Sequence, residues 1–368
     1  MTLAPSLNET LARVRSDLRM GVPLVLVNGD QALVMCAVES LSPERLADLR
    51  ALGQVIMAVT ARRAQTLKLP IYDGDLSRFY VPKDESLGWL AAVADPADDL
   101  MRPLKGPFRV ARDGDGALYA LGLQLVKTAE LLPAIVAVIL TPQAQYRTKK
   151  AFATAHGLSL LTLEPTLLAL QSAQIPQDII AARLPMRLAK AGRLQIFRAT
   201  DGGQEHYAIE VGKPLREAPL LTRIHSACFT GDVLGSLKCD CGPQLHAALG
   251  AMGQAGEGVL LYLNQEGRGI GLANKMRAYA LQDQGFDTVE ANHRLGFEDD
   301  ERDFRLAASI LQQMGFSKLR LMTNNPHKIA MMQAQGMDVV ERVPLNVGVT
   351  SENATYMATK RTKSGHFE

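Results

Sequence analysis

The sequence predicts an α/β protein with α+β character, built from two domains that are each a mixed sheet flanked by helices. Its 368 residues are enough for two ordinary domains. An apolar content of 47% and a mean hydropathy near zero are typical of a soluble chain with a sizeable core. Segments typical of strands alternate with segments typical of helices. The proline-containing, polar stretch QSAQIPQDIIAARLP favours a linker. We therefore expect domains at 1–175 and 180–368.

The first half alternates between apolar, β-branched runs and helix-like segments. Predicted strands cover 22–29, 54–60 and 134–140, and predicted helices cover 42–53 and 121–132. In the second half, two short strands flank the turn-rich DGGQE, and an alternating pattern follows. Predicted strands cover 194–200, 206–212, 258–265 and 318–324; predicted helices cover 242–256, 272–285 and 299–315, with another after NPH. Polar residues gather where strands end and helices begin, where open α/β sheets bind ligands.

Charge and hydropathy exclude two classes of partner. Forty basic and 38 acidic side chains give a formal net charge of +2, so neither a nucleic acid nor an anionic membrane is an expected partner. The longest apolar run, LLPAIVAVIL, is about half of what a membrane span needs, and the first residues lack the apolar core of a signal peptide. We expect a cytoplasmic protein.

Three of the four cysteines are crowded into CFTGDVLGSLKCDCG, as Cys228, Cys239 and Cys241. Thiols stay reduced in a cytoplasm, so this clustering favours a metal over disulfides. Zinc suits thiolate ligands, and three protein ligands would leave an open, catalytic position. A closed structural site, with His225 or His246 as the fourth ligand, remains open on spacing alone. Cys36 stands apart and is predicted to be a buried small apolar residue.

Cations accompany three predicted helix starts. Arg268 lies within EGRGIGL, whose glycines would let backbone N–H groups approach an anion. Arg302 lies in the first turn of the predicted helix 299–315, where a cation opposes the helix dipole, and Lys328 follows TNNPH. The alternatives are a tight turn and a surface ion pair of about 0.5 kcal/mol. Three such cations beside a thiolate cluster favour an enzyme acting on a phosphorylated substrate.

Several long motifs then resemble one family. RIHSACFTGDVLGSLKCDCG, QEGRGIGLANKMRAYALQDQG, DTVEANHRLGFEDDERDF, TNNPHKI and ERVPLNVG, together with the C-terminal YMATKRTKSGH, resemble GTP cyclohydrolase II over residues 180–368. The resemblance implies opening of the guanine imidazole ring of GTP, with loss of formate and pyrophosphate. The product would be 2,5-diamino-6-(5-phosphoribosylamino)pyrimidin-4-one, the first intermediate of riboflavin biosynthesis. It also implies a homodimer.

The resemblance implies site residues one by one. Cys228, Cys239 and Cys241 would hold one Zn²⁺ per chain, which favours the open site, and Mg²⁺ would accompany the triphosphate. Tyr279 would assist hydrolysis at the ring. Arg302 would attack the α-phosphate, with Asp300 in the same first helical turn as proton acceptor. Glu266 would accept hydrogen bonds from the guanine edge. The substrate-binding set is Arg223, His225, Ser226, Gln244, Glu266, Gly267, Arg268, Thr288, Thr323 and Lys328.

The chain departs from the family pattern at three positions. Ala227 replaces a usual glutamate, Asn264 replaces a frequent arginine, and Lys238 replaces an arginine. Loss of a carboxylate or a bidentate donor could weaken ligand binding or change the nucleotide preference. The alternatives are therefore a paralogue that acts on another nucleobase or nucleotide, and a non-catalytic, zinc-stabilised nucleotide-binding regulator.

The first half resembles a degenerate 3,4-dihydroxy-2-butanone 4-phosphate synthase through LRMGVPLVLVNG, AVTARRAQTLKLP and LLPAIVAVILT. That family carries an acidic cluster after the first strand, where this chain has NGDQALVMC with Asp30 alone. The family histidine at the late helix has no counterpart in GLQLVKTAELL. We therefore expect no synthase activity, because both the magnesium ligands and the acid-base group are missing. The expected role is structural or regulatory.

Overall fold

The computed structural model describes residues 3–141, 146–172, 175–200, 202–348, 350–351 and 353. The chain forms two compact units, and the prediction of two mixed sheets flanked by helices is confirmed. The first unit comprises Met1–Ser172 and Ala273–Glu301, and the second comprises Ala173–Leu272 and Arg302–Glu368. The segment Ala273–Glu301, expected in the C-terminal domain, thus packs with the N-terminal half. The division into sequence domains at 1–175 and 180–368 stays a prediction.

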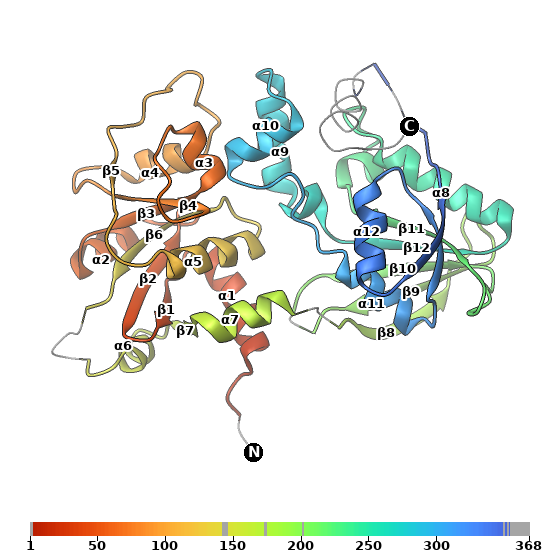
Figure 1. The fold of residues 1–368 in the computed structure, drawn as a ribbon, viewed down its shortest axis with the longest axis horizontal. Coiled ribbons are helices and arrows are strands. Elements are labelled where there is room, and N and C mark those ends of the chain that lie inside the picture. The colour runs from red at the N-terminus through yellow and green to blue at the C-terminus, as the bar shows by residue number, and fades with distance from the viewer. Residues whose placement is uncertain are drawn as a thin grey trace. The chain divides into compact units, whose positions relative to one another are not determined.

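The first unit is built on a seven-stranded sheet in the order β5-β4-β3-β6-β2-β1-β7 (Figure 1). Only β1 and β7 pair in parallel, so the sheet is mixed. The strands are β1 (Leu24–Asn28), β2 (Gln31–Ala37), β3 (Ile56–Thr60), β4 (Leu76–Tyr80), β5 (Arg109–Val110), β6 (Ala134–Ile139) and β7 (Ser159–Thr162).

Alternate side chains of these strands enter two apolar cores, one on each face of the sheet. Leu24 and Leu26 of β1 pack with α1, α5 and α7, whereas Val25 packs with the core that contains α2 and α4. Cys36 lies fully buried in the second core, as predicted. The helices of this unit are α1 (Leu7–Arg19), α2 (Pro43–Leu52), α3 (Ala61–Thr66), α4 (Leu87–Ala94), α5 (Ala117–Thr128), α6 (Lys149–Ala155), α7 (Leu163–Gln171), α9 (Leu272–Asp283, from Ala273 onward) and α10 (Thr288–Leu295).

The second unit has a sheet in the order β14-β13-β11-β12-β10-β9-β8. The four strands from β14 to β12 are parallel, and the three from β10 to β8 form an antiparallel meander. The strands are β8 (Gln177–Arg183), β9 (Gly192–Arg198), β10 (Glu205–Val211), β11 (Leu220–Ser226), β12 (Gly258–Leu263), β13 (Lys318–Met322) and β14 (Asp338–Val343).

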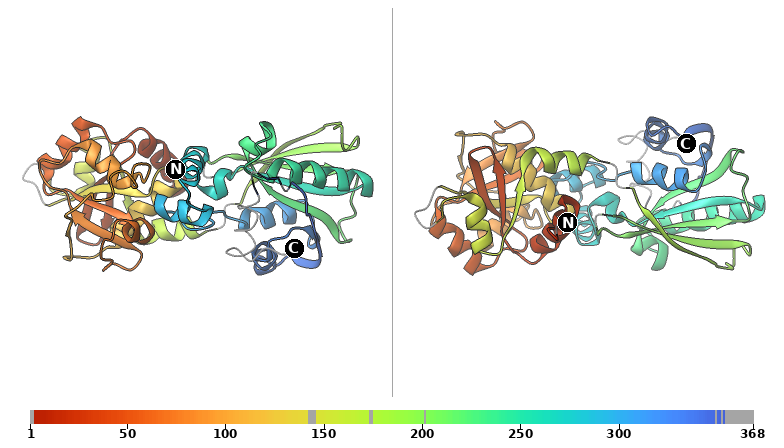
Figure 2. Two further views of the ribbon diagram at one scale, coloured as in Figure 1. Left: turned by 90° about the horizontal axis from the view of Figure 1, so that it is seen from above. Right: turned by 90° about the horizontal axis from the view of Figure 1, so that it is seen from below.

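Helices cover the two faces of the second sheet (Figure 2). Met252 of α8 packs on Leu221 and Leu260, whereas Ile310 of α11 shares the opposite core with Ile224. The helices are η1 (Phe229–Val233), α8 (Cys241–Ala255), η2 (Glu266–Gly269), α11 (Arg305–Gln313) and α12 (Pro326–Ala334). The carboxyl ends of β11, β12 and β13 consequently lead into the loops that carry the candidate site residues.

Two expectations about elements were wrong. Residues 177–183, within the expected linker, form the edge strand β8, because backbone pairing with β9 holds them although most of their side chains are exposed. The helix expected at 299–315 begins only at Arg305. The Asp303 carboxylate accepts the Arg305 N–H at 2.9 Å, so the helix starts after Asp303. Asp300 and Arg302 therefore precede the helix instead of occupying its first turn.

Most residues of the long apolar run at 131–140 are buried. Its residues 134–139 form β6, which lies between β3 and β2 in the first sheet. Among the residues that the structure describes, no helix combines the length and the hydropathy that crossing a membrane requires.

Candidate active site

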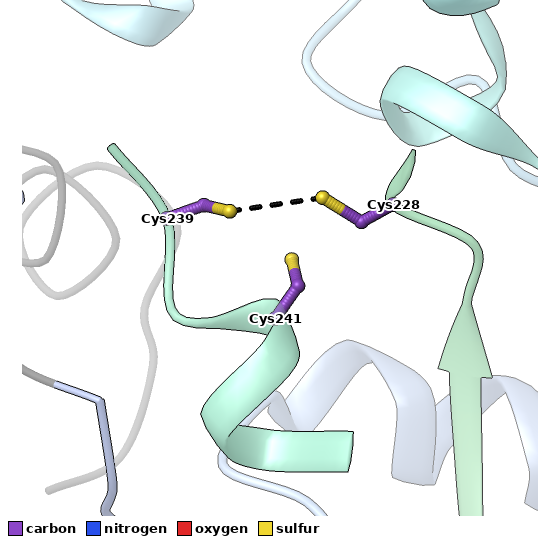
Figure 3. Close-up of side chains that lie close together, drawn as sticks. All are labelled: Cys228, Cys239 and Cys241. Atoms are coloured by element: carbon purple, nitrogen blue, oxygen red, sulfur yellow. Dashed lines mark hydrogen bonds between the residues drawn. The ribbon is translucent and has the colours of Figure 1, made fainter. Parts of the chain in front are cut away.

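The three clustered cysteines converge at the end of β11. Cys228 follows this strand and precedes η1, and Cys241 is the first residue of α8. The Sγ atoms of Cys228, Cys239 and Cys241 all lie within 4.8 Å of one another, and those of Cys228 and Cys239 are 3.7 Å apart (Figure 3). Residues eleven positions apart in the chain thus form one compact sulfur cluster, as their spacing predicted.

Gly231 closes the backbone tightly around these sulfurs. A Cβ atom at this position would lie 2.7 Å from Cys239 Sγ and 3.1 Å from Cys228 Sγ. Real Cβ atoms essentially never come within 2.7 Å of another atom, so a side chain at 231 would displace the sulfur of Cys239. The glycine of the CFTGD motif is therefore a packing requirement of the cluster.

The donor set fits a zinc ion. Hydrogen bonding to Cys228 raises the pKa of Cys239, and contacts with Cys228 and Cys239 raise the pKa of Cys241 well above its ordinary value. Three adjacent thiols resist ionising together unless a cation sits among them, and zinc displaces such protons. Among the described residues the cluster contains cysteines only. His246 is exposed on α8, and His225 pairs with a carboxylate instead.

Asp232 ties the cysteine loop to the sheet. Its carboxylate accepts hydrogen bonds from the Cys228 backbone N–H at 3.0 Å and from the Tyr262 hydroxyl at 2.9 Å. His225 Nε2 lies 3.0 Å from the same oxygen, Asp232 Oδ2. Residue-by-residue reasoning missed Asp232 and Tyr262. The position of Asp232 between Cys228 and Cys239 in the sequence could have indicated its role. The role of Tyr262 follows only from the strand pairing that places it beside His225.

The ring of His225 is buried and held in place. It stacks on Tyr262 with ring centroids 5.5 Å apart. Burial lowers the pKa of His225 despite the opposing effect of Asp232. The ring's Nδ1 has no hydrogen-bond partner among the described residues. A ligand or a water molecule would satisfy this atom.

Arg223 is buried on the same strand and connects to α8. Its Nη1 donates to the Met322 carbonyl at 2.8 Å, and its Nη2 donates to the Gln244 side chain. Gln244 in turn donates to the Asp240 carboxylate, between two of the cysteines in sequence. Burial lowers the pKa of Arg223 to about 10, so the guanidinium stays charged at neutral pH. Arg223 and Gln244 are thus brought together, as expected of one site.

The cations Arg302 and Lys328 both approach the carboxyl end of β11. Arg302 Nη1 donates to Ser226 Oγ at 3.2 Å, and Lys328 Nζ donates to the Ile224 carbonyl at 2.9 Å. Both charges also lie against the Phe304 ring, at 4.9 and 5.3 Å from its centroid. Lys328 occupies the first turn of α12, as the sequence predicted.

Thr323 lies at the end of β13 and is buried. Its Oγ1 accepts the Asn325 backbone N–H at 3.0 Å. This hydroxyl shapes the turn into α12, the helix that carries Lys328.

The EGRGIGL loop forms the short helix η2 with an unusual backbone. Gly267 and Arg268 have φ values of 64° and 61°, in the left-handed region that few residues other than glycine adopt. The Glu266 carboxylate accepts N–H groups from Phe229 at 2.6 Å and from Gly267 at 3.0 Å. Glu266 therefore connects this loop to the cysteine loop.

Three expected site residues belong to the first unit. Tyr279 is half-buried on α9, where Lys275 Nζ lies 5.7 Å from its ring centroid. Thr288 begins α10, and its hydroxyl accepts from the Gln282 amide at 2.9 Å. Asp300 is half-buried in the connection after α10.

All three positions that depart from the family pattern have defined contacts in the second unit. Ala227 N donates to the Leu263 carbonyl at 2.7 Å, which pairs the cysteine loop with the end of β12. Asn264 donates its side-chain amide to the Glu205 carbonyl at 2.5 Å. Lys238 N donates to Ser236 Oγ at 3.3 Å within the cysteine loop.

Comparison with known proteins assigns a family to this arrangement. The family model for GTP cyclohydrolase II matches residues 177–344. A curated GTP cyclohydrolase-2 from Azospirillum brasilense is 39% identical over 361 residues, which are 96% of this chain and 93% of that protein. The chain belongs to the GTP cyclohydrolase II family. The resemblance of residues 180–368 is thereby confirmed, and the Azospirillum cyclohydrolase extends the likeness over the N-terminal half as well.

Two further relatives each match 45% of this chain. A GTP cyclohydrolase-2 from Neisseria meningitidis is 58% identical over 166 residues, 45% of this chain and 84% of that protein. A riboflavin biosynthesis protein RibBA from Bacillus cytotoxicus is 57% identical over 164 residues, 45% of this chain and 41% of that protein. A solved two-domain 3,4-dihydroxy-2-butanone 4-phosphate synthase from A. baumannii is 17% identical with a TM-score of 0.32, covering 92% of this chain and 99% of that chain.

Proposed function

We propose that this protein hydrolyses GTP as a GTP cyclohydrolase II. The guanine imidazole ring opens, formate and pyrophosphate leave, and 2,5-diamino-6-(5-phosphoribosylamino)pyrimidin-4-one remains as the first intermediate of riboflavin biosynthesis. The observation that carries this proposal is the cluster of Cys228, Cys239 and Cys241 within 4.8 Å, in a chain that matches a curated GTP cyclohydrolase-2 over 96% of its length.

Cys228, Cys239 and Cys241 are the proposed holders of one zinc ion. When bound to three sulfurs, zinc supplies Lewis-acid activation of water near neutral pH. Asp232 orients the loop by accepting the Cys228 N–H, and His225 adds a polar ring nitrogen beside it. Glu266 accepts hydrogen bonds from the guanine edge, and Tyr279 assists the hydrolytic step at the ring.

Release of pyrophosphate is assigned to Arg302. A guanidine nitrogen of Arg302 forms a bond to the α-phosphorus as the bond to the pyrophosphate oxygen breaks, and Asp300 takes the nitrogen's proton. A guanidinium is almost always protonated, so a neighbouring base is a requirement of this step. Water then cleaves the phosphorus–nitrogen bond and regenerates the arginine.

The phosphates need a cationic pocket, which this chain can supply from several elements. Arg302 donates to Ser226 and Lys328 donates to the Ile224 carbonyl at one strand end, which supports a triphosphate subsite there. Arg268 on the left-handed turn, with Gly267, adds a further donor, and Mg²⁺ neutralises the remaining charge. Arg223, Gln244, Thr288 and Thr323 complete the proposed substrate-binding set. A cytoplasmic homodimer is part of the same proposal.

Product analysis tests this function. Zinc-loaded protein incubated with GTP and Mg²⁺ should yield formate, pyrophosphate and the diaminopyrimidine. Cys239→Ser should abolish formate release, whereas Arg302→Ala should chiefly impair pyrophosphate release. Asp338→Asn, at an exposed strand position, is the matched control and should retain both activities. Recovery of intact GTP from the unmodified, zinc-loaded protein would refute the proposal.

A second candidate is a cyclohydrolase paralogue with another nucleotide preference. Ala227 removes a carboxylate next to the first zinc ligand, and the Asn264 amide is engaged with Glu205, which supports an altered pocket. A panel of purine nucleotides separates the two, because turnover of a compound other than GTP alone favours the paralogue. Nucleotide binding by calorimetry without any product would instead favour a non-catalytic regulator. We likewise propose that the first half has no synthase activity, with Asp30 as the remaining acidic residue of the expected cluster.

A further inference from the structure

The segment Ala273–Glu301 belongs to the second half by sequence and to the first unit by its contacts. By sequence it lies inside the GTP cyclohydrolase II match at 177–344, and it carries Tyr279 and Asp300. By its contacts it belongs to the first compact unit. Figure 1 shows α10 beside α3 of that unit. The contacts within this unit explain how the segment is held.

A buried hydrogen bond connects the end of α10 to the start of α3. Thr60 Oγ1 donates to the Gly296 carbonyl at 2.7 Å, and both groups are buried. Gly296 has φ of 90°, and a Cβ there would lie 2.9 Å from both Thr60 Oγ1 and Pro133 Cγ. The helix can therefore end against this surface only because residue 296 is a glycine, which supplies both the left-handed turn and the close approach.

The arginines of the segment face carboxylates of the first half. Arg277 of α9 lies between Glu39 and Asp95, at 3.0 and 3.1 Å. Arg294 of α10 lies 3.6 Å from Asp99. These pairs are partly buried, so screening by salt is weaker than on an open surface.

The acidic residues after α10 face cations of the first half in the same way. Arg62 donates to both oxygens of Glu298, at 2.7 and 2.9 Å from Oε2 and 3.2 Å from Oε1. Lys127 Nζ donates to Glu301 at 2.6 Å. Opposite charges thus meet at both ends of the segment, and the last of these contacts is one residue from Asp300.

We propose that the first unit is the scaffold of the catalytic segment Ala273–Glu301. Glu39, Asp95, Arg62 and Thr60 act as positioning residues: they hold α9, α10 and the following connection so that Tyr279 and Asp300 can act. The first half, whose own synthase chemistry we expect to be lost, is then required for cyclohydrolase turnover. The statement about turnover rests on the proposed function, whereas the anchoring itself does not.

The test uses the full zinc-loaded chain and two readouts. Glu39→Gln with Asp95→Asn removes the carboxylate charges that face Arg277. We expect faster hydrogen exchange of amides across Ala273–Glu301 and a kcat lower by about 10- to 100-fold, with a smaller change in KM and unchanged zinc content. Asp48→Asn with Glu164→Gln is the matched control, because both positions are exposed in the same unit and should change neither readout.

A charge exchange separates positioning from general destabilisation. Arg62→Glu alone should raise exchange in the segment and lower kcat, and addition of Glu298→Arg should restore both toward the unmodified values. Unchanged exchange in the first double variant, or faster exchange without loss of kcat, overturns the scaffold. If the unmodified protein does not turn over GTP, the proposed function fails, whereas the exchange data still decide the anchoring.

Discussion

Asp232 accepts a hydrogen bond from the backbone N–H of Cys228 at a distance of 3.0 Å. The same carboxylate accepts from Tyr262 and contacts His225, and its side chain is only 3% exposed. The buried Asp232 carboxylate therefore connects Cys228, the first cysteine of the cluster, to two strands of the sheet. Groups that orient metal ligands in this way contribute to metal affinity although they touch no metal.

Removal of the Asp232 charge should weaken zinc binding. We expect Asp232→Asn to lower zinc affinity by about 10- to 100-fold and to reduce formate release, because a neutral amide accepts the Cys228 N–H less well. Chelator competition measures the affinity. Asp338→Asn removes an exposed carboxylate elsewhere in the same unit and should leave the affinity unchanged. Equal affinities for the two variants would contradict the orienting role of Asp232.

Gly231→Ala tests the packing of the sulfur cluster. The added methyl group would lie 2.7 Å from Cys239 Sγ, so we expect the variant to lose bound zinc while the first unit stays folded. Metal content after gel filtration is the measurement. Gly250→Ala is the control, because no atom lies within 4 Å of the added Cβ and the residue is within α8. That variant should keep its zinc and gain up to about 1 kcal/mol of unfolding free energy.

The buried His225 predicts a pH dependence of stability. Burial holds its pKa below the ordinary value of 6.5, so the unfolded chain binds this proton more readily than the folded one. The free energy of unfolding should therefore fall as the pH drops below about 6.5. His225→Gln should flatten this dependence between pH 5 and 7 in urea titrations. His246→Gln, at an exposed position, should keep the slope of the unmodified protein; equal slopes for both variants would refute the assignment to His225.

Cys36 should differ from the other three cysteines in its reactivity toward an alkylating reagent. Burial raises the pKa of Cys36 to about 12, so its thiol should resist alkylation at pH 8 in the folded protein. Cys228, Cys239 and Cys241 should be protected by zinc and become alkylated after chelation. Peptide mass spectrometry before and after chelation reads out each site. Labelling of Cys36 in the folded protein would contradict its burial.

The sequence predicted the types of residue in the candidate site better than it predicted their contacts. The spacing of Cys228, Cys239 and Cys241 predicted a sulfur cluster, and the cations at 302 and 328 indicated groups that do approach one strand end. The predicted helix start at 299 was wrong: the Asp303 carboxylate accepts the Arg305 N–H in a local turn, and the helix begins after its N-cap residue Phe304. The edge strand β8 was missed because its exposed side chains lack the alternation that reveals a half-buried strand.

The sequence by itself determined the alternation of strands and helices, the cysteine cluster and the family, because these depend on residue types at short spacings. Only the tertiary structure decided that Asp232 joins Tyr262 and His225, and that Ala273–Glu301 packs with the first half instead of the half it follows. The reason is physical. A charged or polar residue such as Arg277 can pair with any opposite group, and only the folded chain selects Glu39 and Asp95 from positions more than 180 residues away.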